Sequence, residues 1–292
     1  TLNGLGNTYS MSGQPRHAVP LFEKKNEIRE KMGDKKNYAQ GLRNLPTMAQ
    51  ISIGALVDSE RNLRRSIDLC HEIESEPDEA IGHLALGRTL FYRGAWQEAE
   101  QELEISTKYW EKTNDVQGLC LDESYRVPRF LLMAREETIF DTRKSNNEYR
   151  ILAIECAQRA LKLADEDTKQ RYTHPSHYVR AHWLLGAAYR ANNDLTLAEE
   201  NLSKALNLCR QINLVEEEAD ILLDLARLRY AQGDFKDAQE KASEALVIPE
   251  RSGYVLQGAD VNLFLATLAL EGYRLEGLKV LSDKDAAIHH AK

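Results

Sequence analysis

HWLLGAAYRANNDLTLAEENLSKA, residues 182–205, is the stretch that decides the fold of this chain. Its small and large residues follow one spacing: His182-x-x-Leu185-Gly186-x-x-Tyr189, then Asn193, then Ala198-x-x-x-Leu202-x-x-Ala205. Small residues on two facing helices allow a close approach, and the large residues between them fill the remaining space. Asn193, between the two halves, suits the left-handed backbone of a tight helix–helix turn. The stretch therefore predicts two paired helices joined by a short turn.

The same spacing returns at three other places in the chain. The further copies are Leu2-x-x-Leu5-Gly6-x-x-Tyr9 with Gly13 and Ala18-x-x-x-Phe22, His83-x-x-Leu86-Gly87-x-x-Leu90 with Gly94 and Ala99-x-x-x-Leu103, and Leu222-x-x-Leu225-Ala226 with Gly233 and Ala238-x-x-x-Ala242. Repetition with a period of about 40 residues marks a stack of similar units, none of which buries its apolar face alone. We therefore predict an all-α solenoid.

These residues resemble the tetratricopeptide repeat, and the resemblance covers almost the whole chain. It implies a right-handed superhelix of helix–turn–helix units, with about 14 helices in seven units. The period is longer than the ~34 residues usual for this repeat class. The additional residues fall at short turns between units, which are Met32-Gly33-Asp34, Thr113-Asn114-Asp115, Ile212-Asn213-Leu214 and Ser252-Gly253-Tyr254.

Seven units can be placed on a single solenoid that spans residues 1–292. Their expected ranges are 1–32, 35–73, 78–111, 115–165, 174–211, 214–248 and 257–292. The fourth unit is irregular, because Pro128 should kink or end its first helix and the polar stretch 136–147 lengthens its turn. Ser282-x-x-Asp285 should cap the last helix. Since both termini fall inside the repeat pattern and the seventh unit is truncated, we expect a fragment of a longer chain.

Composition and charge argue against several classes of partner. Hydrophobic residues make up 42% of the chain and charged residues 29%, as amphipathic helices require. The net charge of -8, without a basic stripe, predicts no binding of nucleic acid. No apolar run approaches the ~18 residues of a membrane helix, so we predict no membrane partner. The acidic run Glu216-Glu217-Glu218 is interpreted as a solvated helix start, favoured by the helix dipole.

No motif of catalysis or cofactor binding stands out. The chain has no GxxxxGK[ST] phosphate loop, HExxH or GxSxG. His174, His177 and His182 are the best metal candidates, but His182 occupies a packing position of the repeat. We therefore predict no enzyme activity, and no catalytic, cofactor-binding or metal-binding residues. Four widely spaced cysteines without a CxxC pattern are interpreted as small buried hydrophobes. They favour a reducing compartment and a cytoplasmic location.

The resemblance places any binding site on an inner groove lined by the first helix of each unit. The residues it assigns to this groove as partner-binding candidates are Arg88, Phe91, Arg180, Trp183, Arg190, Asp220, Asp224, Arg227 and Tyr230. Trp, Tyr and Arg are enriched at binding hot spots, and an arginine can pair through two nitrogens with a partner's carboxylate. The alternative is that Trp183 packs between helices and the arginines pair with neighbouring acids.

The sequence disfavours a second binding mode, a clamp for a C-terminal carboxylate. Asn7, Arg43 and Asn44 resemble part of the clamp with which chaperone-binding members hold a C-terminal carboxylate. The third unit has Ile81 and Ala85 where that clamp needs basic residues.

The predicted function is that of a protein–protein or peptide interaction scaffold. The long period, irregularity and truncation resemble the sensor arrays appended to bacterial STAND-type signal-transduction NTPases, which implies a ligand-sensing, regulatory role within a larger signalling protein. Further domains of the same polypeptide are then expected partners. The pattern also resembles peptide-binding adaptors of the kinesin-light-chain type and peptide-pheromone receptors. A purely structural scaffold is the third alternative.

Overall fold

Helices alone make up the regular secondary structure of the described residues. The computed structural model describes residues 1–135, 145–170 and 174–270. Within these ranges it has thirteen α-helices, one π-helical turn (η1) and no strand. The helices are α1 (Leu2–Met11), α2 (Pro15–Lys31), α3 (Lys35–Leu45), η1 (Pro46–Gln50), α4 (Leu56–Glu72), α5 (Glu76–Tyr92), α6 (Trp96–Thr113), α7 (Val116–Met133), α8 (Asn146–Gln170), α9 (Pro175–Ala191), α10 (Leu195–Gln211), α11 (Val215–Ala231), α12 (Phe235–Ser252) and α13 (Val255–Leu270).

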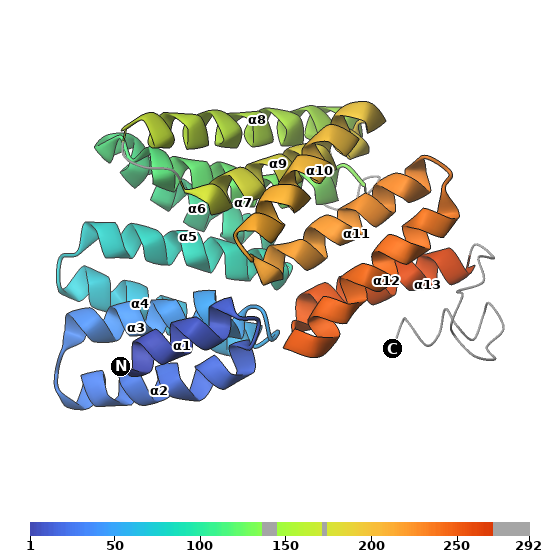
Figure 1. Ribbon diagram of the computed structural model, residues 1–292. Helices are drawn as coiled ribbons and strands as arrows, with labels where there is room; N and C mark the ends of the chain where they lie inside the picture. The colour runs from blue at the N-terminus through green and yellow to red at the C-terminus, as the bar shows by residue number, and fades with distance from the viewer. Residues whose placement is uncertain (136–144, 171–173, 271–292) are drawn as a thin grey trace.

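Consecutive helices pack in pairs, and the pairs stack into a curved array (Figure 1). The all-α solenoid predicted from the repeat spacing is confirmed. The first six expected units each contain two helices, from α1 and α2 to α11 and α12, while α13 opens the seventh. The fourteenth helix and its cap at Ser282-x-x-Asp285 fall within 271–292, outside the described residues. The right-handed sense of the superhelix stays a prediction.

The helices end where the sequence places residues that tolerate a left-handed backbone. Within units, φ is +76° at Gly13, +78° at Gly94 and +67° at Asn193. Between units, it is +52° at Asn114 and +74° at Gly253. Gly and Asn adopt positive φ most readily, so the predicted turn positions are confirmed. Glu74 also has a positive φ, of 55°, and no feature of the repeat pattern anticipates it.

Small residues set the distance between paired helices, as the sequence predicts. A Cβ atom added to Gly87 would lie 2.9 Å from Cγ of Leu103, and one added to Gly186 would lie 2.7 Å from Cγ of Leu202. Both leucines are buried. Contacts this short exclude any side chain at the two glycines unless the helices separate. The small residues of the repeat spacing therefore mark positions where paired helices are in close contact.

Pro128 does not end its helix, so that part of the expectation for the fourth unit is wrong. α7 runs from Val116 to Met133 with Pro128 inside it. Val127 and Phe130, which flank the proline, pack into an apolar cluster with Ala153 and Leu184 of the next two helices. This tertiary packing holds the helix together although the proline removes one backbone hydrogen bond. Residues 136–144 of the polar stretch lie outside the described part of the chain, and α8 begins at Asn146.

The two ends of the described array touch each other. The backbone N–H of Val255, at the start of α13, donates to the carbonyl oxygen of Ser52 over 2.8 Å. A Cβ atom on Gly54 would lie 3.1 Å from Val255, and one on Gly13 would lie 3.0 Å from Oγ of Ser252. Figure 1 shows the turn between α12 and α13 beside the loops of the first two units. We call these five residues the ring contact, because they close the superhelix on itself.

Two expectations from the sequence concern the cysteines and membrane-spanning helices. All four cysteines are buried and none forms a disulfide, and burial raises the pKa of Cys120 and Cys209 to about 12. Over the described residues, no helix combines the length and the apolar character needed to cross a membrane.

Candidate functional site

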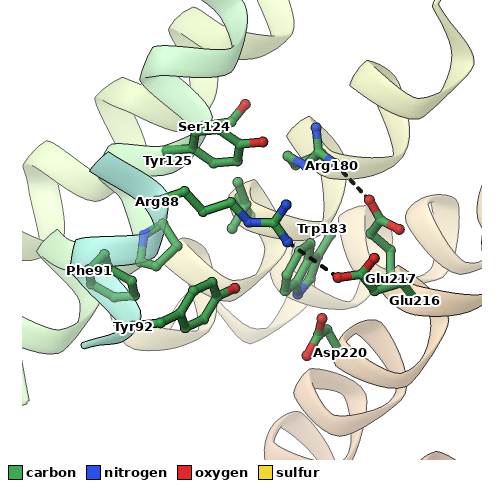
Figure 2. A pocket seen from close by; sticks show the side chains of 12 residues that line it. Arg88, Phe91, Tyr92, Ser124, Tyr125, Arg180, Trp183, Glu216, Glu217 and Asp220 are labelled. Atoms are coloured by element: carbon green, nitrogen blue, oxygen red, sulfur yellow. Dashed lines mark hydrogen bonds and ion pairs between the residues drawn. The ribbon is translucent and has the colours of Figure 1, made fainter. Parts of the chain in front are cut away.

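A pocket opens on the inner face of the ring, between the first helices of four successive units. It has about 530 Å³ of empty space, part of it open to solvent. Figure 2 shows its walls from close by. They are formed by Arg88, Phe91 and Tyr92 of α5, Ser124, Tyr125 and Pro128 of α7, Arg180, Trp183 and Leu184 of α9, and Glu216, Glu217 and Asp220 of α11. We call this space the inner pocket.

Arg88 lies between aromatic rings and is already paired with an acid. Its guanidinium carbon is 5.9 Å from the ring centre of Tyr92 and 5.6 Å from that of Tyr125. One of its nitrogens donates to Glu216 over 3.3 Å. The same carboxylate oxygen accepts a hydrogen bond from Oγ of Ser52, at 3.0 Å. Glu216 therefore connects the inner pocket to the ring contact.

Arg180 forms a second ion pair across the pocket wall. Its Nη2 donates to Glu217 over 2.7 Å, and its guanidinium carbon lies 5.8 Å from the ring centre of Tyr125. Glu217 is only 9% exposed, so the interpretation of residues 216–218 as a solvated helix start is wrong for this residue. Its place in the first turn of α11 faces the preceding unit, where Arg180 meets it. Burial raises the pKa of Glu217, and the nearby Arg180 offsets part of that effect.

Asp220 differs from the other two acids of the pocket. Its one hydrogen bond among the described residues comes from Nε2 of Gln257, over 3.3 Å, and no Lys, Arg or His of that part of the chain forms an ion pair with it. Burial raises the pKa of Asp220 well above its ordinary range, and the neighbouring Asp260 and Glu216 raise it further.

A second pocket adjoins the inner pocket. It has about 630 Å³ of empty space, part of it open to solvent, and is lined by Tyr92, Asp220, Leu256, Gln257, Ala259, Asp260 and Leu263. Because Tyr92 and Asp220 line both pockets, the two spaces meet at these side chains.

Trp183 anchors a polar network beside the inner pocket. Its indole N–H donates to Asp224 over 2.8 Å, and the same carboxylate forms ion pairs with Arg190 and Arg227, each at 3.2 Å. Arg227 also pairs with Asp260, at 3.0 Å. Although burial alone would raise the pKa of Asp224, the two arginines lower it. These contacts match the alternative in which the arginines pair with neighbouring acids.

The structure thus divides the nine predicted groove residues into three groups. Five of them line the inner pocket: Arg88, Phe91, Arg180, Trp183 and Asp220. Arg190, Asp224 and Arg227 form the adjoining network. Tyr230 lies elsewhere, with edge-on ring contacts to Phe235 and Phe264 at 5.6 and 6.1 Å between centroids. Whether these residues bind a partner stays a prediction.

Sequence reasoning missed several residues of the pocket. Tyr125, Ser124 and Pro128 belong to the irregular fourth unit, whose first helix lacks the repeated small-residue spacing. Gly118 does not replace that spacing, because it packs against Trp110 on α6, the second helix of the preceding unit, whereas Gly87 packs against Leu103 within its own unit. Tyr92 follows Arg88 by four residues and so shares its face of α5.

The other candidate sites are occupied by contacts within the chain. The rings of His174 and His177 stack at 4.8 Å, whereas His182 is hydrogen-bonded to Asn201 at 2.9 Å. No group of three metal-ligating side chains occurs among the described residues. Arg43 of the disfavoured carboxylate clamp pairs with Asp78 at 2.7 Å.

Comparison with known proteins agrees with this architecture. Residues 178–250 match the tetratricopeptide repeat family. This region runs from α9 through most of α12 and includes the repeat spacing of residues 182–205. The crystal structure of a thermophilic tetratricopeptide repeat protein from Thermus thermophilus is similar, with a TM-score of 0.54 and 18% identity. The similarity covers 80% of this chain and 99% of that one. Comparison with curated proteins gives no match.

The fold is therefore that of an all-α solenoid resembling tetratricopeptide repeat arrays. Tetratricopeptide repeats generally mediate protein–protein interactions. The likeness to the Thermus protein concerns the fold alone.

Proposed function

We propose that this chain is an interaction scaffold whose inner pocket holds a short segment of a protein partner. One observation carries the proposal: the first helices of four successive units jointly form a pocket walled by Tyr92, Tyr125 and Trp183. Tyrosine, tryptophan and arginine are the residue types enriched at the centres of protein interfaces. A recess that spans four units is therefore suited to partner side chains.

The paired pockets favour an extended segment over a single small molecule. The two spaces meet at Tyr92 and Asp220. Successive side chains on one face of an extended peptide are about 7 Å apart, twice the rise of ~3.3 Å per residue. Two neighbouring recesses can therefore receive two side chains of one extended segment.

Tyr92 offers a direct test, because it lines both pockets and is 40% exposed. Its exposure makes Tyr92→Ala compatible with folding. Partner proteins captured by the intact chain are identified, and their binding segment is titrated against the intact chain and Tyr92→Ala by calorimetry. We expect Tyr92→Ala to weaken binding about tenfold or more, as loss of a hot-spot side chain does.

Tyr109→Ala is the matched control, since Tyr109 lies on α6 and packs edge-on against Trp110, away from the pocket. It removes the same side chain and should leave the affinity unchanged. Equal affinities for all three proteins would place recognition on another surface and refute the proposal.

We further propose that the array serves as the ligand-sensing, regulatory part of a larger signalling protein. The support is the shared role of Glu216, whose carboxylate joins Arg88 of the pocket to Ser52 of the ring contact. A partner that disturbs Arg88 changes the bonding of Glu216, and with it the closure of the ring. Binding in the pocket is thereby converted into a change of overall shape.

Fluorescence energy transfer tests this coupling. Dyes are placed on cysteines introduced at Val57 and Val247, which are 65% and 58% exposed and lie near the two sides of the ring contact. A sensor should change its transfer efficiency when the partner segment binds. An unchanged efficiency at saturation would favour the rigid, purely structural scaffold.

A further inference from the structure

The charges of the inner pocket are unequally satisfied. Both of its cations are already paired, Arg88 with Glu216 and Arg180 with Glu217. The third acid, Asp220, has no cation partner among the described residues. Figure 2 shows Asp220 below Glu216 and Trp183, with no dashed line to either ion pair. The pocket therefore contains one acid more than it has cations to pair with.

The surroundings of Asp220 add further acidic groups, and the nearby arginines are already paired. Glu216 and Glu217 come from its own helix, α11, and Asp260 and Gln257 come from α13. Tyr92 faces it from α5. The cations nearest to these acids are engaged, since Arg88 and Arg180 hold the two glutamates and Arg227 holds Asp260. An ionised carboxylate in such a place is unfavourable unless a cation approaches it.

Gln257 provides a second, independent observation at the same place. Its side chain lines the adjoining pocket and is 5% exposed. The amide nitrogen donates to Asp220, but the amide oxygen, Oε1, is buried without a hydrogen-bond donor. Buried polar atoms normally have a partner. A ligand carrying several N–H donors would satisfy Oε1 of Gln257 and the carboxylate of Asp220 together.

The walls of the two pockets also suit a cation. Arg88 already lies over the rings of Tyr92 and Tyr125, which shows that these rings accept a positive group at the distance of a cation–π contact. Tyr92 also lines the adjoining pocket, together with Asp220 and Gln257. The apolar stem of a long basic side chain can pack along this ring while its charged end reaches the acid.

We infer that the junction of the two pockets takes the lysine or arginine side chain of a basic partner segment, with Asp220 as its counter-ion. The inference rests on the proposed function and specifies the chemistry of the partner. It reverses the expectation that the pocket arginines pair with a partner's carboxylates, because those arginines are paired within the chain.

A pH dependence follows from the same arrangement. The pKa of Asp220 is raised by burial and by Asp260 and Glu216, so the empty site favours the protonated acid. A bound ammonium or guanidinium group stabilises the ionised form and displaces that proton. Affinity should therefore rise with pH as Asp220 ionises, and calorimetry in buffers of different ionisation enthalpy should detect proton release on binding.

Selection from a random peptide library tests the inference without knowledge of the natural partner. Nonapeptides displayed on phage are selected on the intact chain and counter-selected on Tyr92→Ala. The affinities of the selected peptides are then measured by fluorescence anisotropy for the intact chain, Asp220→Asn and Glu240→Gln. Glu240 lies on α12 with its side chain 64% exposed, so Glu240→Gln makes the same change of net charge away from the pocket.

We expect lysine or arginine to dominate one position of the selected peptides. Replacing that residue by glutamine, or Asp220 by asparagine, should each weaken binding about tenfold or more, as the loss of a partly desolvated charge pair does. Glu240→Gln should bind like the intact chain. Circular dichroism should show an intact fold for Asp220→Asn, since the change replaces a partly buried acid with a neutral side chain of the same shape.

Other outcomes distinguish failure of the inference from failure of the proposed function. Selected peptides that depend on Tyr92 but carry no basic residue, or that bind Asp220→Asn equally well, would overturn the inference and leave the proposed function standing. A library that yields no peptide dependent on Tyr92 would overturn the proposed function and, with it, the inference.

Discussion

At the scale of single residues, the glycines of the repeat are the most informative positions. Gly186 could be predicted from spacing alone, because a small residue recurs where two helices touch. A Cβ atom there would lie 2.7 Å from Cγ of Leu202 and 3.0 Å from its backbone nitrogen. We expect Gly186→Ala to lower the free energy of unfolding by about 1–3 kcal/mol through overpacking, measured by urea denaturation.

Gly258 is the matched control for this prediction. It lies within α13, and an added Cβ atom would meet Pro249 at 3.5 Å, an ordinary contact distance. Gly258→Ala should stabilise the protein by about 0.5–1 kcal/mol, because alanine favours the helix. If both substitutions stabilised the chain, Gly186 would not be a point of close contact.

Asp122 shows what spacing cannot reveal, because nothing in the repeat pattern predicts an acid inside the core. It is fully buried and accepts hydrogen bonds from Ser106 and Thr107, both at 2.8 Å. Burial raises its pKa to about 7, against the lowering effect of those hydrogen bonds. In the unfolded chain the pKa returns to ~3.9, so the folded state binds more protons between these values.

The contribution of Asp122 to stability should therefore fall as pH rises from about 4 to about 7. Asp122→Asn keeps the shape and removes the titration. We expect its urea midpoint to decline less than that of the natural chain over this range. Parallel declines would show that Asp122 does not titrate with a raised pKa.

At the scale of elements, helix ends were predictable and helix continuity was not. Gly13 and Asn193 end helices through their own backbone preferences, which are local properties of the sequence. The continuity of α7 through Pro128 depends on apolar contacts with α8 and α9, which no local pattern shows. Tyr125, on that helix, was missing from the predicted groove because α7 lacks the repeated small-residue spacing.

Pro128 should nevertheless weaken α7, because a proline inside a helix removes a backbone hydrogen bond and crowds the preceding turn. We expect Pro128→Ala to raise the free energy of unfolding by about 1–3 kcal/mol. Pro15→Ala provides the comparison, since Pro15 is the first residue of α2, where no helical hydrogen bond is lost. Thermal melts of the two variants measure the difference. An equal gain in stability for Pro15→Ala and Pro128→Ala would contradict this account.

At the scale of the whole molecule, the ring contact is the feature that sequence analysis could not supply. Each unit packs mainly on its neighbours, and the meeting of Gly54 with Val255 depends on curvature summed along the array. Five of the pocket's twelve lining residues were assigned to the groove by the resemblance to the tetratricopeptide repeat, but the charge pairing that decides their chemistry joins helices of different units. Ion pairs of this kind depend on how the units are arranged in the superhelix.

Opening the ring is the last prediction. A Cβ atom on Gly54 would lie 3.1 and 3.3 Å from side-chain atoms of Val255, and φ at Gly54 is +75°. Gly33 has a similar φ of +68°, with no atom near an added Cβ. Alanine at either position carries the same left-handed backbone penalty of about 1–2 kcal/mol, but only Gly54→Ala presses on the ring contact.

Small-angle X-ray scattering should therefore report a larger radius of gyration for Gly54→Ala than for Gly33→Ala. Because Glu216 joins the ring contact to Arg88, Gly54→Ala should also weaken binding of the partner segment more than Gly33→Ala does. Equal dimensions with equal affinities would mean that the contact between the ends of the array is incidental. Larger dimensions with unchanged affinity would separate closure of the ring from recognition in the pocket.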